Sequence, residues 1–345
     1  MDGLNFSPCS DRQPWTDEVS PQERALPLDR LIKNNWFLFG LAGICLVTLI
    51  DATNTLAGMG KWFKSHSGAD AVICTIFFTS GLVLKREEIR AGLRDIQGAV
   101  IALVLIFAVA PLTAFTIGLL PLEPAVRIGL FLVSVMPTTM SSGVVMTGAS
   151  GGNIAHALLI TVLANGLSIV TIPFSLSLLV QAVDSVPMDK AKMMIQMALL
   201  VLLPLGLGLS LRPKKGALRA FLQRVVPVLN QCLILAIVWM GVSEAKATVL
   251  SSGTQVFVIV VLAGFFHAVL LGAGYLSIRL FHIPRGRMES VLFMGGQKTL
   301  PLSVLFQVKL FPQYGLALAF CVFHHFIHLM MDGYLVGRLN RGRKS

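Results

Sequence analysis

The residues best suited to chemistry interrupt an apolar run, Ser290–Leu310, that is long enough to cross a bilayer. Two glycines, an amide, a lysine, a hydroxyl and a proline stand at its middle: Gly295, Gly296, Gln297, Lys298, Thr299 and Pro301. Glycine and proline weaken a helical hydrogen-bond ladder, and broken backbone at membrane depth survives only inside protein or beside a wet cavity. A lysine at this depth costs about 2.5–3.5 kcal/mol on insertion scales, so Lys298 predicts a functional site.

A second apolar segment, Arg127–Thr147, is interrupted in the same way. Its breaks are expected at Pro137 and Gly143, and those of the first segment at Gly295, Gly296 and Pro301. Two broken segments at corresponding places in the two halves of a membrane protein indicate a transporter binding site.

Broken helices leave N–H groups free at one end and carbonyls free at the other. The free N–H ends attract anions, whereas carbonyls and hydroxyls suit sodium. One fixed cation among neutral donors favours an anionic headgroup, although a lone Ser or Thr more often bonds a carbonyl of its own helix. The expected substrate-binding residues are Lys298, Gln297, Thr299, Ser141, Ser142 and Thr139.

Composition identifies a polytopic helical membrane protein. The chain has 345 residues, of which 55% are hydrophobic and 13% charged, and its mean hydropathy is +0.77. A soluble domain carries about 25% charged residues. The net charge of +11 lies mainly in short loops, where cations set topology, and it does not indicate nucleic-acid binding. No catalytic or cofactor motif is evident, so neither an enzyme nor a cofactor is expected.

Hydropathy predicts ten spans in an all-α fold, arranged as a five-plus-five inverted repeat whose two broken helices cross at mid-membrane. The predicted spans are Trp36–Ala52, Asp70–Leu84, Gln97–Leu120, Arg127–Thr147, Ile154–Val180, Ala191–Leu211, Val225–Val242, Thr254–Ile278, Ser290–Leu310 and Tyr314–Leu335. A mostly disordered tail (1–33) precedes the transmembrane domain (34–337), and a basic tail (338–345) follows it. Cation placement puts both termini in the cytoplasm. The expected location is a plasma membrane or a bacterial inner membrane. The expected partners are lipid and a small anionic solute, with a homodimer left open.

Three histidines near the C-terminus, His324, His325 and His328, resemble a metal cluster. No HExxH motif accompanies them, so an intramembrane metalloenzyme ranks below polar contacts inside the helix bundle. Asp332, one turn beyond His328, is the expected partner, and His267 is expected to be a packing or helix-contact residue.

In order and spacing, these motifs resemble the bile acid–sodium symporter superfamily, and within it the branch that contains the seventh human member. The resemblance runs from about Lys33 to Leu335. It is carried by Asn35-Trp36-Phe37, Phe77–Leu82 with Leu84–Glu88, Met136-Pro137 with Ser141-Ser142 and Thr147, Gly151-Gly152-Asn153, Leu203-Pro204-Leu205 with Gly208, and Lys298-Thr299-Leu300.

The resemblance implies a core bundle and a panel bundle, with sodium bound behind the crossing in sodium-coupled relatives. Carried over, Ser142, Thr147 and Gln297 are the candidate sodium ligands, with Ser141 a further match. Phe293 stands about where such relatives have a glutamate, and Lys298 follows the glutamine where many have an asparagine. The lysine ammonium would then replace a sodium ion.

The expected function is secondary transport of a small organic anion by alternating access, independent of sodium. A sodium-coupled symporter is the first alternative. The second is a membrane regulator of calcium homeostasis without transport, because the similar branch has been tied to calcium homeostasis.

Overall fold

The computed structural model describes residues 36–83, 96–139, 142–183, 190–213 and 216–341, and all regular structure within them is helical. The chain divides into two units, 1–40 and 41–345. Of the first unit the structure describes five residues, which open α2 (Trp36–Ile50). The predicted tail 1–33 and the last residues, 342–345, lie outside the described ranges.

Five helical stretches are long and apolar enough to cross a membrane: Ile96–Gly118, Ile154–Ala182, Ala217–Ser251, Gly253–Leu280 and Gly315–Asn340. A sixth arises if α2 and α3 (Thr55–Ser65), bent by 110°, are counted as one span. The chain is therefore a multi-pass membrane protein. Helix occupies each of the ten predicted segments, but several of these helices are too short to cross by themselves.

The first half of the chain contains α4 (Gly68–Val83), α6 (Ile96–Val104), η1 (Leu105–Val109), α7 (Ala110–Gly118), α8 (Pro124–Val135), α9 (Ser142–Ala149) and α10 (Ile154–Val183). The second half contains α11 (Lys190–Met197), η2 (Ala198–Leu202), α12 (Leu203–Leu211), α13 (Ala217–Ser251), α14 (Gly253–Leu280), α15 (Met288–Gly296), α16 (Leu300–Leu310) and α17 (Gly315–Arg341). Helix α17 runs into the predicted basic tail, as far as Arg341.

Helix α3 was not predicted, because its apolar residues are too few to read as a span. The carboxylate of Asp51 organises its start: its oxygens accept from the backbone N–H groups of Thr53 at 3.2 Å and Leu56 at 2.9 Å. The bond from Leu56 satisfies a first-turn N–H group that a helix leaves open, and the bond from Thr53 fixes the turn before the helix. A capping carboxylate therefore builds a short helix where the sequence indicates a loop.

Two π-helical segments precede prolines. η1 leads into α7, which carries Pro111, and η2 leads into α12, which carries Pro204, each at the second helical residue. A proline offers no N–H to the carbonyl four residues earlier, and a π turn shifts the hydrogen bonds to bridge the gap.

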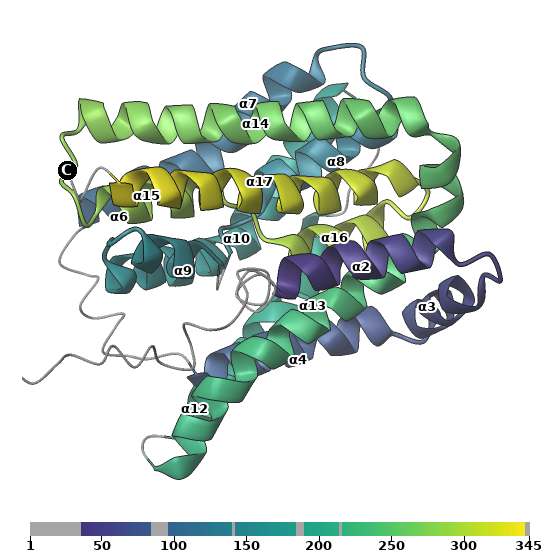
Figure 1. The fold of residues 1–345 in the computed structure, drawn as a ribbon, viewed down its shortest axis with the longest axis horizontal. Coiled ribbons are helices and arrows are strands. Elements are labelled where there is room, and N and C mark those ends of the chain that lie inside the picture. Colours follow the sequence, from purple (N-terminus) through teal and green to yellow (C-terminus); the bar gives the residue numbers. More distant parts are fainter. Residues whose placement is uncertain (1–35, 84–95, 140–141, 184–189, 214–215, 342–345) are drawn as a thin grey trace, which may run out of the picture. The chain divides into compact units, whose positions relative to one another are not determined.

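The helices form two closely packed groups, visible in Figure 1. In one group α4 packs against α12 and α13, and α13 also packs against α3. In the other, α17 lies between α8 and α14, and α15 contacts α14, α6 and α9. The large buried side chains Phe131, Phe266, Phe293 and Phe320 belong to the second group, which also holds both broken helices.

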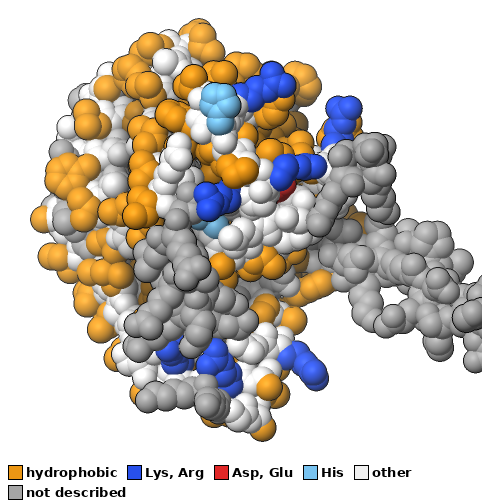
Figure 2. All heavy atoms as spheres, turned by 90° about the vertical axis from the view of Figure 1, so that its left-hand side faces the viewer, with side chains coloured by type: hydrophobic (Ala, Val, Ile, Leu, Met, Phe, Trp, Pro, Cys, Tyr) orange, Lys and Arg blue, Asp and Glu red, His pale blue; other side chains and the backbone are white. Residues whose placement is uncertain are grey.

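One face of the molecule carries Lys and Arg side chains among hydrophobic ones, as Figure 2 shows. Arg285 and Arg287 lie in the connection from α14 to α15, and Arg338 lies near the end of α17. Cations in such short connections are typical of membrane-protein loops.

Candidate functional site

Pro137 ends the first broken helix. Helix α8 closes one residue before Met136, which is extended with φ −70° and ψ 147°. A proline disfavours helical backbone at the preceding residue and has no N–H for the carbonyls behind it. Helix resumes in α9, whose start Thr139 caps by accepting a hydrogen bond from the Gly143 N–H at 3.0 Å.

The second broken helix is interrupted between α15 and α16. Gln297 is extended, with φ −72° and ψ 145°, and Pro301 is the second residue of α16, where a missing N–H costs nothing. The Thr299 N–H donates to the Pro137 carbonyl at 3.0 Å. The two interruptions are therefore in direct contact, and we call this contact the crossing.

Lys298 is buried at the crossing, with 1% of its surface exposed. Its Nζ donates to the carbonyls of Ile106 at 2.8 Å, Ser134 at 2.9 Å and Met136 at 3.0 Å. An ammonium has three N–H donors, so all of them are used. In this conformation Lys298 binds backbone carbonyls of α8 and η1 and has no donor left for a solute.

These carbonyls lack helical donors for a reason that the sequence contains. In η1 the Ala110 N–H bonds the Leu105 carbonyl, and the next donor in that register would be Pro111, which has none. The Ile106 carbonyl is left over and accepts from Lys298. The other two carbonyls belong to the end of α8, beside Pro137. Two prolines thus create the oxygen cage that the ammonium fills.

Gln297 joins the two broken helices through its amide. Its Oε1 accepts from the Thr139 hydroxyl at 2.7 Å and lies 2.8 Å from the Ser142 Oγ, a donor to it. Its Nε2 donates to Asp332 Oδ2 at 2.7 Å and to Met146 Sδ at 3.1 Å. The partners define the orientation of the amide, because a carboxylate oxygen accepts only from the NH₂ side.

Asp332 extends this network to a second buried helix pair. Its Oδ1 lies 2.9 Å from Nε2 of His267 on α14, and both side chains are fully buried. The expected contact between Asp332 and His328 is wrong, because the carboxylate oxygens meet α14 and Gln297. His267 is therefore a helix-contact residue, as expected, and its partner is a buried carboxylate.

The histidine cluster is compact but does not form a metal site. The ring centroids of His324 and His328 lie 5.3 Å apart, and the His267 ring lies 5.8 Å and 5.6 Å from them. Across the described ranges, no three His, Cys, Asp or Glu side chains are placed to hold a metal ion together.

The crossing assembles some of the expected residues and leaves others apart. Thr139, Ser142, Gln297 and Lys298 meet there, whereas Thr299 contributes its backbone N–H. Of the expected sodium ligands, Ser142 and Gln297 contact each other. Thr147 instead donates its hydroxyl to the Gly143 carbonyl, the back-bonding that is common for a lone threonine. Ser141 lies outside the described residues.

Position 143 requires a glycine, because side chains of the second broken helix pack closely against it. It is the second residue of α9, so it does not itself break the helix. A Cβ at this position would lie 2.7 Å from Met294 Sδ and 3.2 Å from Gln297 Oε1. Gly295 and Gly296 end α15, and a Cβ on Gly295 would lie 2.7 Å from a methyl of Leu105 in η1. Glycines therefore let the broken helices and η1 touch.

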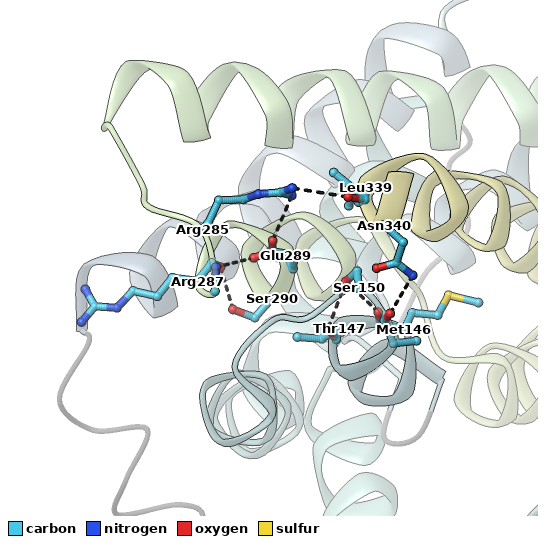
Figure 3. Close-up of polar contacts among 11 residues, drawn as sticks. Met146, Thr147, Ser150, Arg285, Arg287, Glu289, Ser290, Leu339 and Asn340 are labelled. Atoms are coloured by element: carbon cyan, nitrogen blue, oxygen red, sulfur yellow. Dashed lines mark hydrogen bonds and ion pairs between the residues drawn. The ribbon is translucent and has the colours of Figure 1, made fainter. Parts of the chain in front are cut away.

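Figure 3 shows how the outer ends of these helices are tied together. Arg285 donates to Glu289 Oε1 and to the Leu339 carbonyl, each at 3.3 Å, linking the start of α15 to the end of α17. Asn340 Nδ2 donates to the Ala149 carbonyl at the end of α9, at 2.9 Å. This polar clamp fixes α9, α15 and α17 relative to one another on the side away from the crossing.

Sequence reasoning missed three members of the site: His267, Asp332 as a partner of Gln297, and the Ile106 carbonyl. Asp332 had a usable signal, because a carboxylate inside an apolar span marks function by default. Pro111 also indicates that a carbonyl in the preceding turn lacks a donor, but nothing in the sequence connects that carbonyl to Lys298.

Comparison with known proteins identifies the family of the chain. Residues 35–341 match the SBF-like CPA transporter family. The chain is 32% identical over 303 residues to a protein of Arabidopsis thaliana named "Probable sodium/metabolite cotransporter BASS4, chloroplastic", covering 83% of this chain and 70% of the relative. It is 30% identical over 220 residues to "Sodium/bile acid cotransporter 7" of Xenopus tropicalis, covering 61% and 62%. It is 28% identical over 275 residues to "Uncharacterized sodium-dependent transporter YocS" of Bacillus subtilis (strain 168), covering 77% and 84%.

The match to the family spans nearly all of the described chain, including both broken helices and Asp332. The resemblance to the bile acid–sodium symporter superfamily is confirmed, and the family is one of transporters and not of enzymes. The chain belongs to the SBF-like CPA transporter family and is an integral, multi-pass membrane protein.

Proposed function

We propose that the protein is a secondary transporter of a small organic anion and that Lys298 takes the place of a coupling sodium ion. One observation carries the proposal: the ammonium is held by three backbone carbonyls, and carbonyl oxygens are the ligands that transporters of this kind offer to sodium. A fixed cation in that cage makes sodium unnecessary for charge balance.

The anion would bind at the crossing without a direct bond from Lys298. The positive charge nearby and the N-terminal ends of α9 and α16 favour a negative headgroup there. Thr139 and Ser142 offer hydroxyls at the same place. Phe293, fully buried, has no carboxylate that would repel an anion or complete a sodium site.

Alternating access would move a core that contains α8–α9 and α15–α16 against a panel that contains α4, α12 and α13. The two packed groups of helices support this division. A ten-span, five-plus-five inverted repeat with both termini in the cytoplasm fits the two interruptions and the placement of the cations.

Anion binding can be tested on the purified protein without transport. We expect organic anions, screened from acetate to taurocholate in sodium-free buffer at constant ionic strength, to raise the unfolding temperature. Binding at 100 times Kd stabilises a protein by about 2.7 kcal/mol. Ser142→Ala should weaken the effect, whereas Ser210→Ala, whose exposed hydroxyl bonds the Gly206 carbonyl in α12, should not. No stabilisation by any anion would contradict the proposal.

A sodium-coupled symporter is the second candidate, because the relatives are named as sodium-coupled or sodium-dependent. It requires an oxygen-lined sodium site besides the carbonyls used by Lys298. The oxygens of Ser142, Thr139 and Gln297 are its best source, and the sodium titration that closes the Discussion separates the two candidates.

A further inference from the structure

We propose that a pocket between α3 and α13 binds the phosphate group of an anionic membrane phospholipid. The pocket has a volume of about 480 Å³ and is open to the surface. It is formed by the end of α2, the first turns of α3 and the last turns of α13. None of its lining residues belongs to the crossing, so this second site does not depend on the proposed transport.

The position of α3 indicates the depth of the pocket in the membrane. The chain bends by 110° between α2 and α3, so α3 does not continue the direction of the apolar helix before it. Gly60 faces α13, where a Cβ would meet the Ser243 side chain, while Met59, Trp62 and Phe63 are exposed. Exposed aromatic residues beside lysines are typical of a helix at the membrane–water interface. The pocket therefore lies at the level of the lipid headgroups.

Two lysines supply the positive charge of the pocket. Lys61, on α3, is exposed, and its side chain forms no hydrogen bond or ion pair with another described residue. Lys246, on α13, is 9% exposed, and its Nζ donates to the Asp51 carbonyl. An ammonium has three N–H donors, and the structure gives Lys246 one acceptor among the described residues. Both lysines can therefore donate to a phosphate.

The acidic groups nearby have partners of their own. Asp51 also lines the pocket, and its carboxylate accepts from the Thr53 hydroxyl at 2.6 Å and from the Leu56 N–H at 2.9 Å. Glu244 pairs with Lys64 at 3.5 Å, so this second acidic group is neutralised outside the pocket. Two lysines and one aspartate leave the lining with one net positive charge, which favours an anion.

The apolar edge of the pocket distinguishes a phospholipid from a free anion. Ile50 and Leu250 line the pocket at the ends of α2 and α13, and they are 69% and 60% exposed. A phospholipid matches both parts, because its phosphate can meet the lysines while its acyl chains cover the exposed apolar side chains. A free phosphate ester would leave this edge uncovered. The lining as a whole therefore fits an anionic lipid.

The test is native mass spectrometry of the purified full-length protein in a neutral detergent. The protein is titrated with dioleoylphosphatidylglycerol and, in parallel, with the zwitterionic dioleoylphosphatidylcholine. We expect phosphatidylglycerol to bind more tightly to the wild type. Lys61→Gln should weaken its tightest binding about fivefold, because one lysine contributes an attraction of this size to an anionic lipid. This variant should fold normally, since the exposed Lys61 side chain has no contact to lose among the described residues.

Two further variants complete the design. Gly58 lines the pocket, and nothing lies within 4 Å of a Cβ there, so Gly58→Leu adds a side chain to open space without changing the charge. It should weaken phosphatidylglycerol binding about tenfold by occupying the pocket. Lys64→Gln is the matched control: it removes the same charge from the same helix, but Lys64 pairs with Glu244 and does not line the pocket. It should change the affinity less than about twofold.

Several outcomes would overturn the proposal. Equal affinity for the two lipids would show that the phosphate charge is not recognised. Binding unchanged by Lys61→Gln or Gly58→Leu would place the lipid elsewhere, and an equal loss in Lys64→Gln would indicate general attraction to a basic surface. If glycerol 3-phosphate at constant ionic strength binds as tightly as phosphatidylglycerol, the occupant is a free phosphate ester and not a lipid.

Discussion

Lys298 and Lys246 are both buried lysines that bind backbone carbonyls, but their surroundings differ. Lys298 is 1% exposed and uses all three donors on carbonyls of η1 and α8. Lys246, on α13, is 9% exposed and donates to the Asp51 carbonyl. It borders an open pocket of about 480 Å³ that Asp51 and Lys61 also line.

The difference indicates that Lys298 is a fixed part of the fold, whereas Lys246 can exchange one hydrogen-bond partner for another. A charge inside protein is tolerated only when its hydrogen bonds are complete, which is the arrangement at Lys298. At Lys246 the neighbouring pocket lets water or a solute replace a lost contact. We therefore expect unequal losses of stability when the two lysines are removed.

The largest effect is expected for Lys298→Ala. It leaves three buried carbonyls without donors and should destabilise the protein by about 2–4 kcal/mol, even after the gain from removing a buried charge. Thermal unfolding in detergent measures the loss. Lys309→Ala is the control, because this lysine pairs with Asp70 near the surface and should cost less than about 1 kcal/mol. Equal losses in the two variants would contradict a structural role for the carbonyl cage.

The second-largest loss of stability is expected for Gly143→Ala. This change should destabilise the protein by about 1–3 kcal/mol, because the added Cβ would lie 2.7 Å from Met294 Sδ. Gly166→Ala provides the comparison, since nothing lies within 4 Å of a Cβ there and helix α10 should gain up to about 1 kcal/mol. Unfolding temperatures of both variants check the prediction. A neutral Gly143→Ala would mean that the broken helices are not in tight contact.

Lys246→Ala should cost only about 0.5–1.5 kcal/mol, because one carbonyl loses its donor beside an open pocket. Unfolding temperatures of Lys246→Ala and Lys298→Ala, measured under the same conditions, test the difference between the two lysines directly. A loss as large as that of Lys298→Ala would show that burial and not the completeness of the hydrogen bonds decides the effect.

The smallest effect concerns Asp51. The Thr53 hydroxyl and the N–H groups of Leu56 and Ala57 hold the pKa of the Asp51 carboxyl below its ordinary value. A lowered pKa stabilises the folded protein above the unfolded-state pKa, and this stabilisation is lost as pH falls through the folded-state pKa. The difference in unfolding temperature between wild type and Asp51→Asn should therefore be present at neutral pH and vanish in acid. A difference that grows in acid would contradict the sign.

Much of the fold follows from local sequence. Each of the ten apolar runs contains helix, and Pro137, Gly295 and Gly296 mark the interruptions, because proline and glycine act on the backbone where they stand. An asparagine that follows two glycines predicts a helix cap, and Asn153 Oδ1 accepts from the His156 N–H at 3.2 Å. Helix α3 was not predicted from the sequence, because its start depends on hydrogen bonds to the side chain of Asp51.

The partners in the site could not be predicted, because they come from distant parts of the chain. His267 and Asp332 are 65 residues apart, and Lys298 reaches a carbonyl 192 residues away. The sequence indicated that Lys298 binds a substrate or replaces a sodium ion, but it did not show which carbonyls the ammonium contacts. That side chain fills a cage made by Pro111 and Pro137, which requires the packing of three separate segments.

The most direct test of the central claim is a sodium titration of thermal unfolding at constant ionic strength, for wild type and Lys298→Ala. Because ligand binding to the folded state raises stability, a vacated carbonyl cage that accepts sodium must respond. We predict that sodium leaves the wild type unchanged and stabilises Lys298→Ala. Stabilisation of the wild type by sodium would contradict the replacement of the ion by Lys298 and favour sodium-coupled transport.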